Sequence, residues 1–470
     1  MRRQARPALW LLFAAVPALL DAQGFGIYEQ GTCSMGRAGT GVAAPCADGS
    51  AMFFNPAGLA GLKGGHATAG VTLIDVEGGF TDDIFHQETS LDDPLLAVPQ
   101  AYVSYSPSPR LGVGVGLFAP YGLQTEWPLT FDGRFAGYKN ILRSIYVQPT
   151  LAYQVTSWLS LGGGLDVVIG KVELNQRLDL SNQVIPAIPG VPIPAGTSFA
   201  QFGIAPGTDF ADAHLEATKT TLTAHWGGIV KFNEKLSIGG RYLMHAKFDY
   251  SGTAQFGQVP TNLIIPADIV IGGVTVAPAG TPVDALLRGL GVFNTILVPQ
   301  SVSTSITNPE QVVFGAAYKP RRDWTLLADY QFTRWAKRFS QVNIDFANPL
   351  LNRVLYERYQ NTNGFRFGAE WAKDATWTLR GGYLYHEGAA PPETVTPLLP
   401  EGDRNEFTGG VTVKLAKGLT GDVAYQYIKQ NDRRGRTREP ILNGVPTIGM
   451  NNGLYTFYAH LFGVSLSYAF

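Results

Sequence analysis

From residue 66 onward, apolar side chains alternate with small or polar ones at every second position of this 470-residue chain. The C-terminal segment shows the pattern best, with one apolar face and one small or polar face: Phe470, Tyr468, Leu466, Val464 and Phe462 against Ala469, Ser467, Ser465 and Gly463. A strand of this kind suits the lipid-exposed wall of a transmembrane β-barrel. A soluble β-sandwich also alternates, but its strands are usually shorter, about 5–6 residues.

The same alternation recurs in about 14 segments, which predicts strands near residues 66–80, 98–106, 110–119, 140–155, 158–180, 216–232, 235–255, 300–319, 323–347, 355–372, 375–388, 403–416, 418–432 and 453–470. Six tight turns, marked by Pro, Gly, Asn, Asp, Ser or Thr, alternate with seven longer connections. Short turns at one end and long loops at the other are typical of outer-membrane barrels. The predicted fold class is therefore all-β, a 14-stranded antiparallel transmembrane β-barrel over residues 66–470, with both ends of the barrel on the periplasmic side.

Residues 1–22 are typical of a signal peptide. Arg2, Arg3 and Arg6 precede an apolar core over residues 8–20, which is too short to span a membrane. An uncleaved anchor is the alternative interpretation. No later segment reaches the roughly 18 uninterrupted apolar residues of a spanning helix. A closed barrel is then the remaining way for the mature chain to cross a bilayer.

Residues 23–65 do not follow the strand pattern, because they are rich in Gly and Ala and contain few β-branched residues. We expect this segment to form a compact N-terminal plug (hatch) inside the barrel lumen, with a disordered periplasmic tail as the alternative. Cys33 and Cys46 lie close together within it. Since an exported protein meets an oxidising compartment, we expect a disulfide between them, the alternative being two buried free thiols.

The composition argues against several other classes of protein. Only 16% of the residues are charged, compared with about 25% in a typical soluble protein, and the net charge is −1. This balance gives no electrostatic reason to expect nucleic acid as a partner. The sequence has no Gly-x-Ser-x-Gly motif and no His-x-x-x-His pair among its seven histidines. Residues 39–44 imitate a dinucleotide-binding motif, but no strand precedes them. We expect no enzyme activity, no cofactor and no metal site.

Two groups of motifs resemble a known family. Near the N-terminus stand Gly24-Phe25-Gly26-Ile27-Tyr28-Glu29-Gln30, Gly36-Arg37-Ala38, Ala47-Asp48 and Asn55-Pro56-Ala57-Gly58. Further along stand Phe118-Ala119-Pro120-Tyr121-Gly122-Leu123, then Trp127, then Gly133-Arg134. Together they resemble the FadL family, the outer-membrane transporters of long-chain fatty acids and other hydrophobic compounds. The resemblance covers the layout of the whole mature chain and is weakest in the long loops.

This resemblance implies a pathway in which substrate is captured among outer loops and passed to a pocket inside the barrel. A kink in the third strand then opens the wall, and the substrate leaves sideways into the bilayer. Carried over residue by residue, Gly24 and Phe25 lie where the mature N-terminus meets the ligand. Asn55 heads the plug triplet and Arg37 matches the plug arginine. Cys33 and Cys46 are not part of the family pattern, and a bridge between them would stiffen the plug.

The third predicted strand supports a gate on physical grounds. Gly112, Gly114 and Gly116 share one of its faces, and Pro120 follows. Glycine weakens a strand or lets another backbone come close, and proline cannot donate to the ladder. We interpret these four residues as gate residues. The alternative is that the glycines only give clearance for the plug.

Two expected outer loops, residues 181–215 and 256–299, are unusually apolar for segments that face water. They are expected to capture substrate, to pack on each other as a lid, or both. Four arginines crowd the last outer loop: Arg433, Arg434, Arg436 and Arg438. They either bind lipopolysaccharide phosphates, which suit the guanidinium group, or are simply solvated.

We therefore expect a monomeric protein of the bacterial outer membrane that moves hydrophobic small molecules, such as fatty acids or hydrocarbons, by passive diffusion. Outer-membrane lipid and lipopolysaccharide are its other expected partners. One alternative is a general diffusion porin. Another is an outer-membrane enzyme that acts on lipids. The sequence leaves the choice of substrate open.

Overall fold

The computed structural model describes residues 25–92, 95–184, 196–271, 273–437 and 452–470. The predicted signal peptide, Gly24 and Arg438 lie outside these residues. No helix among the described residues is long and apolar enough to cross a membrane. The helical elements are α1 (Thr32–Met35), α2 (Ala51–Phe54), η1 (Pro56–Gly61), η2 (Asp132–Phe135), η3 (Phe199–Phe202), α3 (Val283–Gly289), η4 (Val292–Ile296), η5 (Pro349–Leu351) and η6 (Pro392–Thr394).

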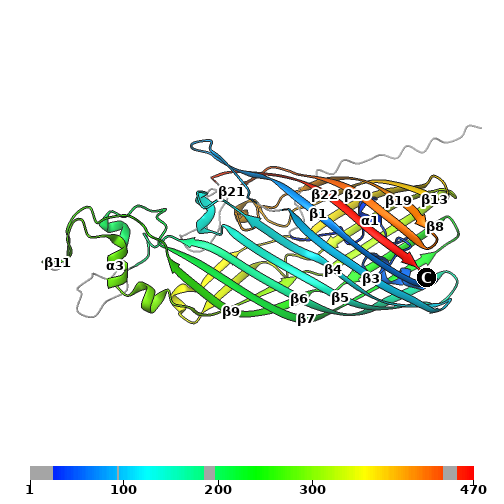
Figure 1. Ribbon diagram of the computed structural model, residues 1–470, viewed down its shortest axis with the longest axis horizontal. Coiled ribbons are helices and arrows are strands. Elements are labelled where there is room, and N and C mark those ends of the chain that lie inside the picture. Colours follow the sequence, from blue (N-terminus) through cyan, green and yellow to red (C-terminus); the bar gives the residue numbers. More distant parts are fainter. Residues whose placement is uncertain (1–24, 93–94, 185–195, 272, 438–451) are drawn as a thin grey trace, which may run out of the picture.

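Strands make up most of the molecule and run along the horizontal axis of Figure 1. They are β1 (Gly64–Asp82), β2 (Glu88–Ser90), β3 (Leu96–Ser108), β4 (Leu111–Glu126), β5 (Lys139–Gln154), β6 (Leu159–Leu178), β7 (Ala211–Lys231), β8 (Leu236–Leu243), β9 (Ala246–Gln258), β10 (Ile269–Ile271), β11 (Val274–Ala277), β12 (Gln300–Asn308), β13 (Gln311–Arg321), β14 (Trp324–Thr333), β15 (Gln341–Phe346), β16 (Arg353–Tyr356), β17 (Thr362–Ala372), β18 (Trp377–His386), β19 (Arg404–Ala416), β20 (Leu419–Gln430), β21 (Arg433–Gly435) and β22 (Gly453–Ala469).

The sheet closes on itself because β1 pairs antiparallel with both β3 and β22. The described residues form fourteen wall strands, since β8–β9, β12–β13, β14–β15, β16–β17 and β20–β21 are each one strand with an interruption. The predicted fold, an all-β antiparallel barrel of fourteen strands, is confirmed. Each predicted segment coincides with one wall strand.

The interruptions were not predicted. Residues 300–319, 235–255, 323–347, 355–372 and 418–432 were each expected to form one continuous strand, and this expectation is wrong. The first breaks at Pro309 and Glu310, and the second at Met244 and His245. Proline has no backbone N–H for the ladder, which accounts for the first break. The apolar alternation continues on both sides of each break, so the pattern alone does not reveal it.

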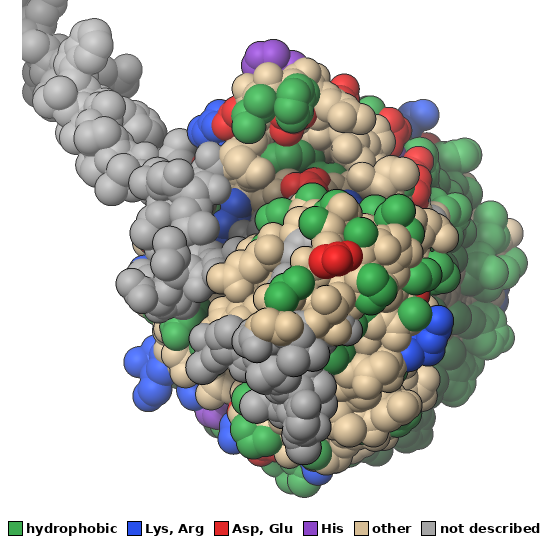
Figure 2. All heavy atoms as spheres, turned by 90° about the vertical axis from the view of Figure 1, so that its left-hand side faces the viewer, with side chains coloured by type: hydrophobic (Ala, Val, Ile, Leu, Met, Phe, Trp, Pro, Cys, Tyr) green, Lys and Arg blue, Asp and Glu red, His purple; other side chains and the backbone are tan. Residues whose placement is uncertain are grey.

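The outer face of the wall is apolar, as the alternation predicts. On β22, Phe462, Val464 and Leu466 are each about half exposed, whereas Leu461 and Ser465 are buried in the lumen. Figure 2 shows hydrophobic side chains over the part of the wall visible behind the loops at the right. In a bilayer this surface would contact lipid, as barrel walls do.

At one end of the barrel the strands are joined by short turns, and at the other end the connections form a lobe beyond the wall (left in Figure 1). The lobe contains α3, η3, η4 and the β10–β11 hairpin, packed around a core that includes Phe199, Phe210, Ile265, Val283 and Leu287. Much of the apolar loop sequence therefore packs on itself. Ile264 and Val270 nevertheless remain more than half exposed on the lobe.

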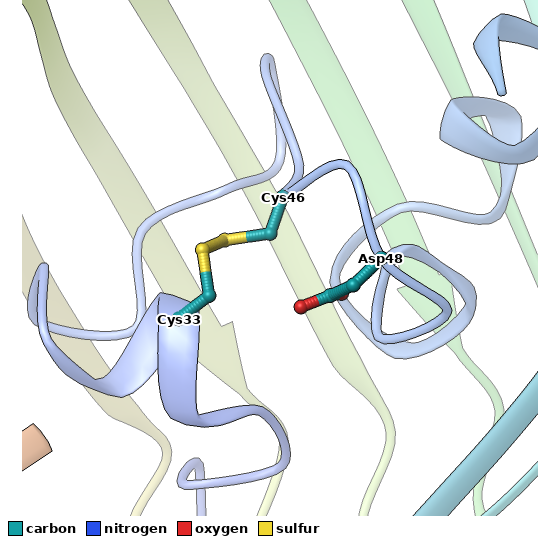
Figure 3. Close-up of side chains that lie close together, drawn as sticks. All are labelled: Cys33, Cys46 and Asp48. Carbon is teal, nitrogen blue, oxygen red and sulfur yellow. A yellow bond between two sulfur atoms is a disulfide. The ribbon is translucent and has the colours of Figure 1, made fainter. Parts of the chain in front are cut away.

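The N-terminal segment, residues 25–63, lies against the inner faces of the wall strands and contains α1, α2 and η1. The sulfur atoms of Cys33 and Cys46 are bonded to each other, and Asp48 lies beside them (Figure 3). Since both sulfurs belong to the disulfide, neither is available as a thiolate ligand, and this group offers a cation one carboxylate at most.

The disulfide leads to the first prediction. The native protein purified without reductant should show no alkylation of Cys33 or Cys46 by mass spectrometry. A Cys33→Ser/Cys46→Ser variant should destabilise the N-terminal segment by about 3 kcal/mol, measured by hydrogen exchange, because the bridge closes a short loop. The heat-modifiable gel mobility of the barrel should stay unchanged, because the bridge lies within one segment. Complete alkylation of the native oxidised protein would contradict the prediction.

Candidate functional site

Asn55 fixes the N-terminal segment to the wall. It is fully buried, and its Nδ2 atom lies 2.6 Å from the carbonyl oxygen of Val42, 3.0 Å from that of Gly228 and 3.2 Å from that of Gly240. A Cβ at Gly227 would come within 2.4 Å of its Oδ1 atom, so glycine is needed there for the close approach. Asn55 lines neither cavity described below, and its contacts are those of an anchor.

Arg37 is a second anchor of the same segment. Its Nη2 donates to the carbonyl of Ala44 (2.8 Å), its Nε donates to that of Thr40 (3.1 Å), and its Nη1 lies 3.4 Å from a carboxylate oxygen of Glu370 on β17. Arg37 is almost fully buried and also lines neither cavity. The two plug residues inferred from the resemblance thus hold the segment in place, whereas Phe25 lines both cavities.

The wall is not hydrogen-bonded along the whole length of β3 and β4. Their ladder runs from the turn as far as the pair Ala101 and Leu117, with a register shift near the turn. Residues 96–100 of β3 still pair with β1, but the described ladder gives them no partner on β4. Beyond Leu117 the described residues of β3 and β4 are not paired with each other. Before β3 begins, the backbone N–H of Asp92 donates to the carbonyl of Glu126 at the end of β4 (2.9 Å).

Where β4 leaves β3, it bonds to the N-terminal segment instead. The backbone N–H of Ile27 donates to the carbonyl of Pro120 (2.9 Å), and that of Gly122 donates to the carbonyl of Phe25 (3.0 Å). The side-chain amide of Gln30 makes two bonds to the backbone of Ala119. Its Oε1 accepts from the N–H, and its Nε2 donates to the carbonyl, each at 3.0 Å. The β4–β5 register shifts at this point, between Phe118 and Tyr121.

The three glycines of β4 lie below this point, where Gly114 and Gly116 are paired on both sides and Gly112 lies at the register shift near the turn. A Cβ at Gly112 would meet the carbonyl oxygen of Leu59 at 2.5 Å, and one at Gly114 would meet Met52 at 2.9 Å. One at Gly116 would meet the Tyr102 ring at 2.9 Å. The contacts of Gly112 and Gly114 are with the N-terminal segment and favour the clearance interpretation for these two glycines. The contact of Gly116 is with a ring of β3, and Pro120 lies at the register shift.

Tyr121 connects this part of β4 to the interrupted strand β12–β13. Its hydroxyl donates to the carbonyl of Pro309 (2.7 Å) and accepts from Nε2 of Gln311 (2.8 Å). Gln311 in turn accepts from Arg241 (2.6 Å), which donates to the carbonyl of Phe53 in α2 (2.7 Å). A buried chain of hydrogen bonds therefore links β4, the interrupted strand β12–β13, β8 and the N-terminal segment.

Residues of β3 and β4 that are not paired with each other line a large cavity. This lateral cavity encloses about 1870 Å³ including its open mouth. Residues 96–99 of β3, 117–119 and 121–125 of β4 and 25–29 of the N-terminal segment form much of its lining. Its far end is polar and contains Glu29, His386, Glu401, Arg404 and Glu406.

A second cavity, the luminal cavity, encloses about 890 Å³ with its mouth and is almost entirely apolar. Its lining includes Tyr250, Val302, Ile306, Val342, Ile344 and Leu355 on the inner face of the wall. It shares Phe25, Leu123, Leu142 and Leu399 with the lateral cavity. These four side chains therefore separate the two cavities. The Phe25 ring packs edge-on against Trp335 and Phe339, with centroids 4.8 and 5.4 Å away.

At the polar end, Gln426 donates to the carboxylates of both Glu29 and Glu406. Burial raises the pKa of the Glu29 carboxyl above its ordinary value, and the negative charge of Glu406 acts in the same direction.

Sequence reasoning missed this pair and also Arg404, because neighbouring residues in the sequence do not indicate which wall positions meet the N-terminal segment. Tyr121 stands within a motif quoted above, but its contact with Pro309 has no local signal.

A closed fourteen-stranded barrel with an apolar outer face defines this protein as a multi-pass β-barrel of the bacterial outer membrane. The chain belongs to the OMPP1/FadL/TodX family, since the family model "Outer membrane protein transport protein (OMPP1/FadL/TodX)" matches residues 13–470. It is 24% identical to outer membrane protein P1 of Haemophilus influenzae, with 99% of each chain covered. It is 21% identical to the long-chain fatty acid transport protein of Escherichia coli O157:H7, over 99% of this chain and 98% of the relative.

Solved structures share the fold. A FadL homologue from Pseudomonas aeruginosa superposes with a TM-score of 0.75 at 19% identity, over 95% of this chain and all of that one. The toluene transporter TodX of Pseudomonas putida superposes with a TM-score of 0.66 at 17% identity, over 96% of this chain and all of that one. At these identities the likeness supports the barrel fold.

The Asn55 contacts give the second prediction. Asn55→Ala should leave carbonyl groups of Val42, Gly228 and Gly240 without this donor. It should destabilise the docked N-terminal segment by about 1–3 kcal/mol, the typical effect of leaving buried polar groups unpaired. Faster hydrogen exchange over residues 25–62, with unchanged exchange in β19 and β20, is the expected result. Asn343→Ala, at an exposed wall position, is the control. Equal exchange in the two variants would show that Asn55 is not an anchor.

Proposed function

We propose that this protein carries hydrophobic molecules, long-chain fatty acids or hydrocarbons, across the outer membrane by passive diffusion and releases them sideways into the bilayer. The observation on which this rests is that the β3–β4 ladder ends at Ala101 and Leu117, beside residues of both strands that line the lateral cavity. An apolar molecule gains free energy wherever it stays out of water, about 25 cal/mol for each Å² of buried apolar surface. A route from apolar lumen to lipid keeps it out of water throughout.

In the proposed route, substrate enters the luminal cavity from the outer loops and meets Phe25. Displacement of Phe25, together with Leu123, Leu142 or Leu399, joins the two cavities that these side chains separate. The substrate then passes between residues 96–100 of β3 and the outer half of β4. The names of two relatives, a long-chain fatty acid transport protein and a toluene transporter, support this class of substrate.

We assign three parts to the chain: a signal peptide (1–22), an N-terminal plug (23–65) and the barrel (66–470). The anchoring contacts of Asn55 and Arg37 support the plug assignment. A general diffusion porin needs a water-filled lumen, and the contacts of α1 and η1 with the wall strands support a lumen filled by the plug instead. Liposomes with the protein should therefore not swell in small sugars, and swelling would favour the porin alternative.

The enzyme alternative has one structural candidate. The His225 ring lies between the Asp166 carboxylate (2.6 Å) and the Thr150 hydroxyl (3.1 Å). Hydrolases use such a row, with a hydroxyl as nucleophile, a histidine as base and a carboxylate behind it. All three side chains are buried, and none lines either cavity. A lipid ester would have no access to the Thr150 hydroxyl from these cavities. We therefore propose transport without hydrolysis, and turnover of a chromogenic ester would contradict this.

At the outer end, we propose that the lobe and the loops offer the first apolar contact for substrate. Ile84 and Phe85 at the first loop tip, and Ile264 on the lobe, are strongly exposed. Figure 2 shows hydrophobic side chains scattered over this end.

Of the loop arginines, Arg434 forms an ion pair with Asp83, and Arg433 donates to the carbonyl of Ala390 (2.6 Å). These partners favour a role in holding the loops together. Contact with lipopolysaccharide and a monomeric state remain part of the proposal.

Lateral exit gives the third prediction. Cysteines at Val98 and Ala119, on opposite sides of the separation, should abolish uptake of a hydrophobic substrate when a short bifunctional thiol reagent joins them. Binding in detergent should persist. The control pair is Val103 and Val115, which already face each other in the paired part of β3 and β4. Joining the control pair should leave uptake unchanged. Normal uptake after joining Val98 and Ala119 would favour a route past the plug into the periplasm.

Tyr121 gives the fourth prediction. Tyr121→Phe keeps the ring contacts with Phe25 and Trp335 but removes the bonds to Pro309 and Gln311. The outer half of β4 should be held less firmly, with faster hydrogen exchange there and uptake reduced about fivefold to thirtyfold, the effect of 1–2 kcal/mol. Tyr146→Phe is the matched control, since its hydroxyl has only a 3.5 Å contact with Asn308. Unchanged uptake in Tyr121→Phe would rule out this role.

A further inference from the structure

Three neighbouring wall strands, β8–β9, β12–β13 and β14–β15, are interrupted at the same height. The breaks at His245 and Glu310 lie side by side, since the ladders between these strands continue on both sides of them. The third break follows Thr333, and the backbone N–H of Arg334 donates to the carbonyl of Glu310 (3.1 Å). At this break Trp335 is fully buried, whereas the side chain of Arg334 is half exposed. The interruption therefore directs an aromatic ring inward and leaves a guanidinium group on the surface.

The side chains at these breaks form a basic patch, which consists of His245, Arg334, Lys337 and Arg338. Arg338 donates two bonds to the carboxylate of Glu310 (2.7 and 3.1 Å), and Arg334 lies 3.4 Å from the same carboxylate. Nη2 of Arg338 lies 3.1 Å from Nδ1 of His245, and the charge of Lys337 acts on the same ring. Among the residues that the structure describes, Glu310 is the one carboxylate that forms ion pairs with this patch. Three cationic side chains therefore face one carboxylate, and the patch keeps a net positive charge.

The basic patch lies at the edge of the apolar wall that is nearer the long loops. A transmembrane strand crosses a bilayer in about 9–11 residues. Counted from the short-turn end, Arg334 stands ten positions after Trp324, where β14 begins, and His245 stands nine positions after Leu236, where β8 begins. Toward the short turns the outer face is apolar, and Phe314 there is more than half exposed. Toward the long loops the exposed side chains of β12 are serines: Ser301, Ser303 and Ser305. Since the long loops are extracellular in such barrels, the patch faces the headgroups of the outer leaflet.

A row of apolar side chains crosses four neighbouring strands next to the patch, on the side of the short turns. The ladders align them as Trp226, Tyr242, Val312 and Phe332. The rings of Trp226 and Tyr242 have centroids 4.6 Å apart, and Trp226 is half exposed. The charges of Arg334 and Arg338 act on Tyr242, which shows that the row and the patch adjoin. One side of the wall thus offers cationic groups to a headgroup and an apolar surface to the chains attached to it.

We infer that the basic patch binds a phosphate group of lipopolysaccharide in the outer leaflet, with acyl chains of this glycolipid lying on the apolar row. A phosphate accepts several charge-assisted hydrogen bonds, and guanidinium groups offer such donors in a fixed planar arrangement. Glu310 and His245 hold Arg338 in place, while Arg334 and Lys337 are exposed to the headgroups. The inference rests on the part of the proposed function that concerns lipopolysaccharide and gives this contact a place on the wall. It does not depend on the transport route, because no residue of the patch lines either cavity.

The test measures binding of lipid A, the phosphorylated anchor of lipopolysaccharide, to the purified protein in detergent. Lipid A from which both phosphates have been removed is the comparison probe. Wild-type protein should prefer the phosphorylated form, and Arg334→Gln/Lys337→Gln should bind it about tenfold more weakly, the effect of two charge-assisted contacts at an exposed site. Arg334→Lys/Lys337→Arg keeps both charges and should keep most of the affinity. Arg321→Gln/Arg322→Gln removes two charges from an exposed short turn and serves as the control.

Several outcomes would overturn the inference. Equal binding of the two lipids by wild-type protein would rule out recognition of phosphate, and unchanged binding by Arg334→Gln/Lys337→Gln would rule out this patch. Weaker binding in Arg434→Gln instead would place the phosphate at the last outer loop. Equal affinity for phosphatidylglycerol would show a site for any anionic lipid, not one for lipopolysaccharide.

Uptake of a hydrophobic substrate separates this inference from the transport proposal. It should be unchanged in Arg334→Gln/Lys337→Gln, because the patch lies outside both cavities. Failure of the wild-type protein to take up any hydrophobic substrate would overturn the transport proposal and leave the lipopolysaccharide site standing. The heat-modifiable gel shift shows whether each variant is folded.

Discussion

The structure depends on an exchange of hydrogen-bond partners by β4. Inside a bilayer every backbone N–H and C=O needs a partner within the protein, so a wall strand cannot simply leave its neighbour. Here Ile27, Phe25 and Gln30 of the N-terminal segment bond to the outer half of β4 in the place of β3. In the part of β3 that has no partner on β4, Pro99 has no backbone N–H, so one donor fewer needs a partner there. The separation of the wall is thus a stable arrangement of the barrel.

This exchange requires the N-terminal segment to be held in a fixed position. Asn55, Arg37 and the disulfide fix its middle, and Arg241 fixes α2 through the carbonyl of Phe53. Glycines on the facing strands let the segment approach closely, as Gly112 does for Leu59. The glycine contacts and the loss of β3–β4 pairing therefore depend on the same segment. The half of β4 that is paired with β3 packs on the N-terminal segment, and the other half is hydrogen-bonded to it.

The barrel could be predicted because its signal is local and repeated. Each wall strand alternates between lipid and lumen, and each turn at the short end contains breaker residues, so strand number and positions follow from the sequence. The site could be predicted only in part. Phe25 and Pro120 were found through motifs, but the Tyr121–Pro309 contact, the four side chains between the cavities and Arg404 join positions far apart in the chain. The break at Pro309 was missed because alternation continues across it.

The two cavities and the exchange of partners meet at one residue, Phe25. Its side chain lines both cavities, and its carbonyl accepts the N–H of Gly122 on β4. A ligand can shift a conformational equilibrium only by as much as its affinities for the two states differ. In the proposed route, a substrate in the luminal cavity displaces the Phe25 side chain. Since Phe25 contacts β4 through the hydrogen bond to Gly122 and the ring of Tyr121, this proposal couples occupancy of the lumen to the position of β4.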